Sequence, residues 1–150
     1  MRKWLLVILC LSILLWMSSR ASAGLVQQDE GQCVYDTDLN ISWLIDANPS
    51  GERMNWSDGS RWINGLDLAG LRGWRLPSIE ELEHINKIDG ISPSHPGPFE
   101  NLQAYHYWSS TEYASQPRYA WGYNFFWMYP EWGWIGYHHY IWPVRNGSCQ

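Results

Sequence analysis

Gly73-Trp74-Arg75-Leu76-Pro77-Ser78-Ile79-Glu80-Glu81-Leu82-Glu83 is the stretch that decides the fold of this chain of 150 residues. Gly73 permits a sharp turn, because a residue without a Cβ can take backbone angles that are closed to other residues. Pro77 biases the residue before it away from helical angles. Residues 74–76 are therefore predicted to be a short extended segment that leads into a new element.

The second half of this stretch predicts a helix that begins after Ser78 and ends near Lys87. Ser78 and Glu81 have the S-x-x-E spacing of a capping box, in which each side chain accepts a hydrogen bond from the other residue's amide. Glu83 precedes Lys87 by four residues, a favourable surface pair. Apolar residues at three-residue spacing should face a core. They are Ile79, Leu82 and Ile85.

Residues 1–23 have the pattern of a signal peptide. A positive start at Arg2 and Lys3 precedes an apolar run over residues 4–17, and the small residues of 21–23 form a cleavage site. The run is shorter than the roughly 20 apolar residues that span a bilayer. We expect cleavage after Ala23, a secreted or periplasmic protein and no stable membrane span. An uncleaved N-terminal anchor is the alternative.

Charge excludes several classes of partner. Without Arg2, Lys3 and Arg20, the chain keeps 7 basic and 15 acidic side chains, a formal charge of −8. Such a protein is a poor match for nucleic acid, where neutralising phosphates supplies most of the affinity. It is equally a poor match for an anionic membrane surface.

Two cysteines remain after this cleavage, Cys33 and Cys149. An oxidising compartment favours a disulfide between them, with two free thiols as the alternative. A loop of this length contributes about 4–5 kcal/mol in the chain-entropy model. We expect residues 24–33 to form a loose leader and residues 34–149 a single folded domain whose ends lie close together.

The patterns before the deciding stretch predict one strand and one helix. Leu39, Ile41 and Trp43 share one face of an alternating segment, which predicts a half-buried strand. Ser57 is a candidate N-cap for a helix that continues to about Leu68.

Strands dominate the predictions after the second helix. Short β elements joined by turns favour an antiparallel sheet, and helices followed by strands indicate an α+β fold. We expect two short helices packed on small antiparallel sheets. The strands are predicted at 107–111, 119–127 and 137–145, with a turn at 130–133.

Aromatic residues are concentrated between Tyr105 and Trp142, where they make up 16 of 38 residues. Most should form the core, because Tyr and Trp bury large areas on a sheet. One short sheet cannot bury all of them, so the rest should line a surface or a groove that stacks against a sugar or anchors a protein. The candidates for ligand binding are the rings flanking the predicted turns. They are Trp127, Trp132, Trp134 and Tyr137.

Catalytic and metal-binding motifs are absent from the sequence, which has no HExxH, CxxC or GxSxG pattern. His138 and His139 are adjacent, so on a strand they would point to opposite faces. Asp36, Asp38 and Asn40 alternate on one face and could contact a cation, but no further ligand is visible nearby. We expect no metal, no cofactor and no enzymatic activity.

The remaining histidines give no pattern of their own. His84, His95 and His106 are isolated along the chain, and each is interpreted as a surface or hydrogen-bonded side chain.

Four ordered motifs resemble the bacterial DUF1566 family, also called the Lcl C-terminal domain. They are Gly73–Leu82, Tyr107–Tyr113, Ala120-Trp121 with Asn124-Phe125, and Trp142–Arg145. The likeness spans roughly 34–145. It implies a compact domain related to C-type-lectin-like and formylglycine-generating-enzyme-like folds, export, and often a role at the cell surface. It implies no catalytic residues.

The family is named after a Legionella collagen-like adhesin, whose module is trimeric and binds sulfated glycosaminoglycans. A chain with a charge of −8 should repel sulfated polymers, so that ligand is not expected here. We expect instead a non-enzymatic binding module for another glycan or for a protein. A self-assembling structural component of the envelope, hence a homo-oligomer, and an enzyme with a divergent site are the alternatives.

Overall fold

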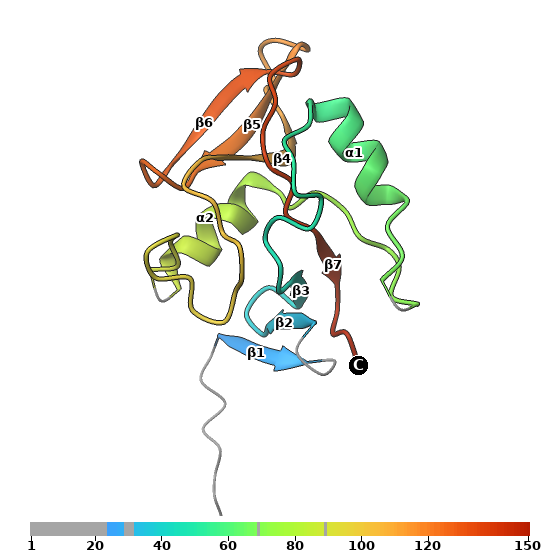
Figure 1. The fold of residues 1–150 in the computed structure, drawn as a ribbon. Helices are drawn as coiled ribbons and strands as arrows, with labels where there is room; N and C mark the ends of the chain where they lie inside the picture. The colour runs from blue at the N-terminus through green and yellow to red at the C-terminus, as the bar shows by residue number, and fades with distance from the viewer. Residues whose placement is uncertain (1–23, 29–31, 69, 89) are drawn as a thin grey trace, which may run out of the picture.

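The computed structural model describes residues 24–28, 32–68, 70–88 and 90–150, so the predicted signal peptide at 1–23 lies outside the described residues. Two helices and two small antiparallel sheets form an α+β domain, as predicted (Figure 1). None of the described helices is long and apolar enough to cross a membrane.

The sheets have four and three strands. The first has the order β1-β2-β3-β7, with bounds Leu25–Gln28, Cys33–Asp36, Ile41–Leu44 and Val144–Asn146. The second has the order β4-β5-β6, with bounds His106–Glu112, Tyr119–Asn124 and Tyr129–Trp134. The helices are α1, Trp56–Asn64, and α2, Ile79–Lys87, and α2 lies between the two sheets (Figure 1).

The deciding stretch joins both sheets to α2, and its contact with the second sheet is the amide of Ser110 on β4, which donates to the carbonyl of Pro77 at 2.8 Å. Gly73 has a φ of 80°, the left-handed angle that its turn requires. The backbone of Arg75 exchanges two hydrogen bonds with Val144 at β7, of 2.8 and 3.0 Å. Two guanidinium nitrogens of Arg75 each lie 2.8 Å from a carboxylate oxygen of Glu81. The same carboxylate completes the predicted capping box with Ser78, so one side chain orients both the extended segment and the helix.

The predicted end and apolar side of α2 are confirmed. The helix ends at Lys87, and Lys87 Nζ lies 2.9 Å from Glu83 Oε2. The three predicted core positions of α2 are all buried.

The strand predicted to be half-buried is buried on both faces. All four residues of β3 are buried, because Ile41 and Trp43 face a core cluster with α2 while Leu44 faces a second cluster with α1. Leu39 lies in the turn before β3 and is exposed. The alternation of apolar residues along this strand can be read from the sequence. The residues that bury its second face are distant in the sequence and cannot be found from that alternation.

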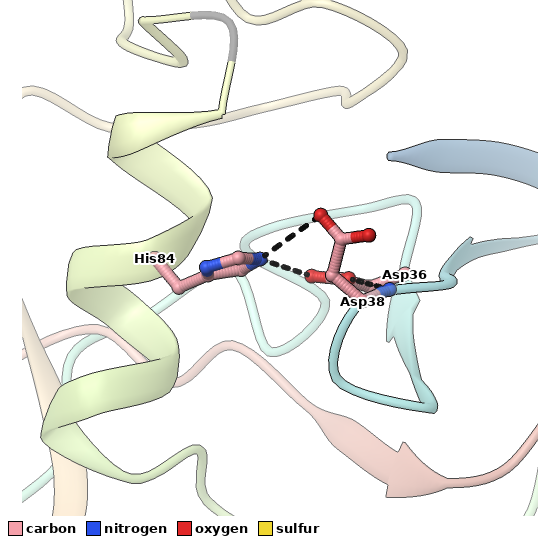
Figure 2. Close-up of side chains that lie close together, drawn as sticks. All are labelled: Asp36, Asp38 and His84. Carbon is pink, nitrogen blue, oxygen red and sulfur yellow. Dashed lines mark hydrogen bonds and ion pairs between the residues drawn. The ribbon is translucent and has the colours of Figure 1, made fainter. Parts of the chain in front are cut away.

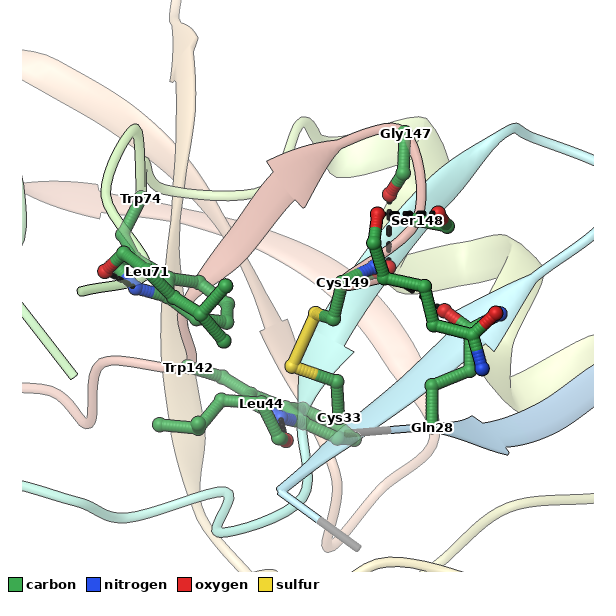
Figure 3. The surroundings of a disulfide bond; sticks show 11 residues. Gln28, Cys33, Leu44, Leu71, Trp74, Trp142, Gly147, Ser148 and Cys149 are labelled. Atoms are coloured by element: carbon green, nitrogen blue, oxygen red, sulfur yellow. Dashed lines mark hydrogen bonds between the residues drawn. A yellow bond between two sulfur atoms is a disulfide. The ribbon is translucent and has the colours of Figure 1, made fainter. Parts of the chain in front are cut away.

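A disulfide joins Cys33 to Cys149 across 116 residues, as predicted, with 6.4 Å between the two Cα atoms (Figure 3). The segment before it differs from the expected leader, because Leu25–Gln28 forms β1 and pairs with β2. The side chain of Gln28 also accepts a hydrogen bond from the amide of Cys149 at 3.1 Å. Edge strands tolerate polar residues, so the polar composition of residues 25–28 gave no indication that this segment forms a strand.

Helix α1 begins two residues earlier than predicted. Asn55, rather than Ser57, is the N-cap, and its side-chain oxygen accepts from the amide of Asp58 at 2.9 Å. Asn and Ser offer equivalent capping oxygens, so the spacing alone could not separate them. The helix ends at Asn64 instead of continuing to Leu68.

The predicted turn at 130–133 is wrong, because these residues lie inside β6. The chain turns instead at 125–128, after β5 ends at Asn124. Pro130 fits because β6 is an edge strand, where a residue without an N–H is tolerated. The predicted strand at 137–145 is reduced to β7, and it closes the first sheet rather than the second.

Candidate functional site

A cavity of about 420 Å³ lies beside β6. This volume falls within the range of sites for small ligands, roughly 300–1,000 Å³. Its lining comes from the start of β4, from β6, from the segment after β6 and from the loop before α1. The lining residues are Arg53, Tyr105, His106, Glu131, Trp132, Gly133, Tyr137, His138 and His139.

Backbone pairing brings these segments together. Met54 and His139 exchange two hydrogen bonds of 2.9 Å, which place the loop before α1 beside the segment after β6. The amide of Tyr140 donates to the carbonyl of His106 at 3.0 Å, which places the same segment beside β4. The cavity is therefore held by regular backbone contacts on several sides.

Asn124 orients two polar groups of the cavity. Its side-chain oxygen accepts from the amides of Phe126 and Trp127 at 3.0 and 3.2 Å, which caps the turn after β5. Its amide nitrogen therefore points the other way, 2.8 Å from His106 Nε2 and 3.5 Å from Glu131 Oε2. His106 Nε2 also lies 3.1 Å from Glu131 Oε2. One buried amide thus orients both the imidazole and the carboxylate.

The two inner imidazoles of the cavity are neutral near pH 7. The rings of His106 and His139 stack with centroids 4.8 Å apart and an interplanar angle of 22°. Burial, followed by the neighbouring His106, lowers the pKa of His139 to about 4. Burial also lowers the pKa of His106, against the opposing effect of Glu131. A neutral imidazole offers one donor and one acceptor to a hydroxyl group, and at His106 the contacts of Nε2 with Asn124 and Glu131 leave only Nδ1 for such a role.

The positively charged side chain of Arg53 lies at the edge of the cavity. The guanidinium carbon of Arg53 lies 4.8 Å from the centroid of the Tyr105 ring, a cation–π contact. Arg53 adds donors to the acceptor that Glu131 supplies. A second hollow of about 430 Å³, lined mainly by α1 and the loop before it, shares Arg53 and His138 with the cavity.

The four predicted ligand-binding rings are all exposed, but the structure does not bring them together. Tyr137 lines the cavity, whereas Trp132 lies along its edge with its ring stacked on Tyr113, outside the cavity, at a centroid distance of 5.1 Å. Trp134 packs edge-on against Tyr137, with centroids 5.8 Å apart. Trp127 lies in the turn after β5, where it contacts Phe126 instead. Binding by any of the four stays a prediction.

Sequence reasoning missed the polar half of the cavity. His106 was interpreted as isolated, yet it stacks on His139 and faces Glu131. These residues are at least 25 positions from His106 along the chain, so no local spacing signals the contact. Of the adjacent pair, His138 is exposed and His139 is buried, and both lie between β6 and β7 rather than on a strand.

A second cluster lies between α2 and the turn after β2 (Figure 2). His84 Nε2 is 3.5 Å from Asp36 Oδ2 and 3.9 Å from Asp38 Oδ2, so His84 is not isolated. One ligand atom from each of the three residues lies within 4.8 Å of the others. Asn40, the third residue of the predicted cation-facing set, accepts instead from the hydroxyl of Tyr35.

Comparison with known families matches residues 32–145 to the Lcl C-terminal domain, which confirms the resemblance drawn from the motifs. No curated protein sequence matches the chain.

Proposed function

The chain belongs to the Lcl C-terminal domain family, and from this premise we propose that it is an exported, non-enzymatic module that binds a glycan in the cavity beside β6. One observation carries the proposal. The cavity combines the exposed ring of Tyr137 with Glu131 and two neutral imidazoles. A sugar ring presents an apolar C–H face and a rim of hydroxyls, and this lining offers a surface for each.

The charge of the protein selects among glycans. The cavity contains the Glu131 carboxylate, and the predicted mature chain carries a formal charge of −8. Both repel sulfate groups, so the proposed ligand is an uncharged or basic glycan. Because the neighbouring hollow shares Arg53 and His138 with the cavity, a chain of several sugar units can extend from one into the other.

The proposal also covers where the protein is located and which fold it has. Residues 1–23 are proposed to direct export and to be removed after Ala23, leaving a secreted or periplasmic protein. The Cys33–Cys149 disulfide supports this, because disulfides persist in oxidising compartments. We further infer a C-type-lectin-like fold with the two ends of the domain near each other, supported by the α+β arrangement.

A glycan array probed with the disulfide-bonded protein tests the proposal. Wild type should bind uncharged or basic glycans, and Tyr137→Ala should lose that binding. Trp127→Ala is the matched control, because Trp127 is equally aromatic and more exposed but lies outside the cavity. A blank array, or equal binding by wild type and Tyr137→Ala, would contradict the proposal. Circular dichroism should confirm that each variant is folded.

A protein partner or a second copy of the chain is the second candidate ligand. Phe126 and Trp127 favour it, since they are 59% and 64% exposed and pack on each other at the turn after β5, away from the cavity. Sedimentation at rising concentration should then show an oligomer that Trp127→Ala disperses. A monomer at all concentrations would exclude self-association.

A further inference from the structure

We propose that Asp36, Asp38 and His84 bind a divalent transition-metal ion, with Zn²⁺ the best match, where α2 meets the turn between β2 and β3. The site is separate from the cavity beside β6 and does not depend on the proposed glycan binding. Figure 2 shows the imidazole on α2 pointing toward the two carboxylates.

The backbone segments that carry the three side chains are fixed by hydrogen bonds of their own. Asp36 is the last residue of β2, and its Oδ1 accepts from the amides of Asp38 and Leu39 at 3.0 and 3.1 Å, which shapes the turn. His84 lies on α2, whose start is fixed by the capping box of Ser78. A preorganised set of ligands loses little conformational entropy when an ion binds.

Two polar atoms at this contact lack hydrogen-bond partners among the residues that the structure describes. Asp36 is fully buried, and its Oδ2, the oxygen that faces His84, receives no hydrogen bond. His84 Nε2, 3.5 Å away, has none either. An unpartnered buried carboxylate oxygen is costly, so buried polar groups without partners call for a specific explanation. A cation between the two atoms would satisfy both.

A metal ion fits this geometry better than a proton does. A proton on His84 Nε2 can make one strong hydrogen bond, whereas two carboxylates face that atom, at 3.5 and 3.9 Å. A divalent ion can take one oxygen from Asp36 and one from Asp38 together with the imidazole nitrogen. It also balances the charge of both carboxylates, which a single proton does not.

The ligand types select the class of ion. Ca²⁺ and Mg²⁺ are bound by oxygen ligands, while imidazole together with carboxylates suits Zn²⁺. Three protein ligands leave one position of a tetrahedral Zn²⁺ site for water. The side chains of His84 and Asp38 are 28% and 40% exposed, so the site is open on one side to that water. The ion would link α2 to the first sheet.

Isothermal titration of Zn²⁺ into chelator-treated, disulfide-bonded protein, expressed from the full-length sequence, tests the proposal. Wild type should bind one ion at this site, and His84→Gln and Asp38→Asn should each weaken that binding by about 100-fold, the upper range for disturbed metal sites. His95→Gln is the matched control, because His95 is exposed and outside the cluster. His106→Gln controls for Zn²⁺ held in the cavity, and neither control should change the binding of this ion.

Thermal unfolding with and without Zn²⁺ gives a second readout. Zn²⁺ should raise the melting temperature of wild type and of His95→Gln but not of His84→Gln, because an ion bound only to the folded state stabilises it. Asp36 is left unchanged in these tests, since its Oδ1 also shapes the turn. Absence of Zn²⁺ binding in wild type, binding of equal strength in His84→Gln, or binding of Ca²⁺ in place of Zn²⁺ would overturn the proposal.

Discussion

Two sets of aromatic rings in this domain share a composition and differ in environment. Around Trp142, the rings of Trp43 and Phe99 pack with centroids 4.8 Å from its own, and all three are buried. Beside β6, Trp132 and Tyr137 stay 45% and 56% exposed. Trp132, Tyr137 and Trp142 come from one short stretch of sequence, so composition does not decide which ring is buried.

Position in the sheets explains the difference. Trp142 enters the layer between α2 and the first sheet, where its indole N–H donates to the carbonyl of Leu44 at 2.9 Å. Strand β6 is an edge strand with a partner on one side only, so fewer neighbouring residues shield its aromatic rings from solvent. Buried rings in this domain are expected to determine stability, and exposed rings to determine binding.

Replacing one buried ring should have the largest effect on stability. Trp142→Ala should lower the free energy of unfolding by about 3–5 kcal/mol, because it removes a fully buried indole and leaves a cavity. Trp127→Ala should change it by no more than about 0.5 kcal/mol, as for most surface substitutions. Urea titration of both variants measures the difference. Similar losses in the two would break the comparison.

The buried region of the domain also contains the Cys33–Cys149 disulfide. Replacing Cys33 and Cys149 with Ser should lower the free energy of unfolding by about 2–5 kcal/mol, because the disulfide closes a loop of more than 100 residues. Urea titration with and without a reducing agent checks this. Reductant should destabilise wild type and leave the double variant unchanged, and insensitivity of wild type would count against the expected role.

His139 lies where the two regions meet, and it should make stability depend on pH. Its ring centroid is 4.3 Å from that of the buried Trp108, while the side chain also lines the cavity. Its pKa is lowered from 6.5 to about 4, so between these values the unfolded chain takes up a proton that the folded protein does not. Stability should therefore fall as the pH drops from 6.5 to 4, by about 2–3 kcal/mol from this group.

Urea titrations at pH 7 and pH 4 measure this dependence. His139→Gln should reduce the loss on acidification relative to wild type. His106 acts in the same direction, because burial also lowers its pKa, so part of the loss should remain. An unchanged loss in His139→Gln would show that other groups dominate.

The sequence predicted what short-range spacing determines. Ser78 and Glu81 are three residues apart, so the start of α2 could be predicted correctly. The Cys33–Cys149 pair followed from counting the cysteines that remain after the predicted signal peptide, together with the oxidising compartment that this signal predicts. Pro130 led to the wrong prediction of a turn, because only the strand order reveals that it lies on an edge strand.

The polar parts of both candidate sites required the structure. Glu131 and His106 are 25 residues apart, and His84 is 48 residues from Asp36, so only tertiary packing brings each pair together. The carboxylates of the second cluster could be noticed from their alternation in the sequence. Their imidazole partner lies on α2, and the sequence pattern of that helix gives no indication of a contact with these carboxylates. Exposed rings could be chosen from the sequence, whereas the cavity that includes the ring of only one of the four could not.

The most direct test of the central claim is NMR titration with a glycan that binds on the array, following the backbone amide of Gly133 in the cavity lining and the indole N–H signals. We predict that the Gly133 signal shifts with the glycan, while the indole signals of the buried Trp142 and of the exposed Trp127 stay in place. A shift of Trp127 without one of Gly133 would move the binding site to the turn after β5. If no glycan shifts the Gly133 signal, the cavity beside β6 is not a glycan site.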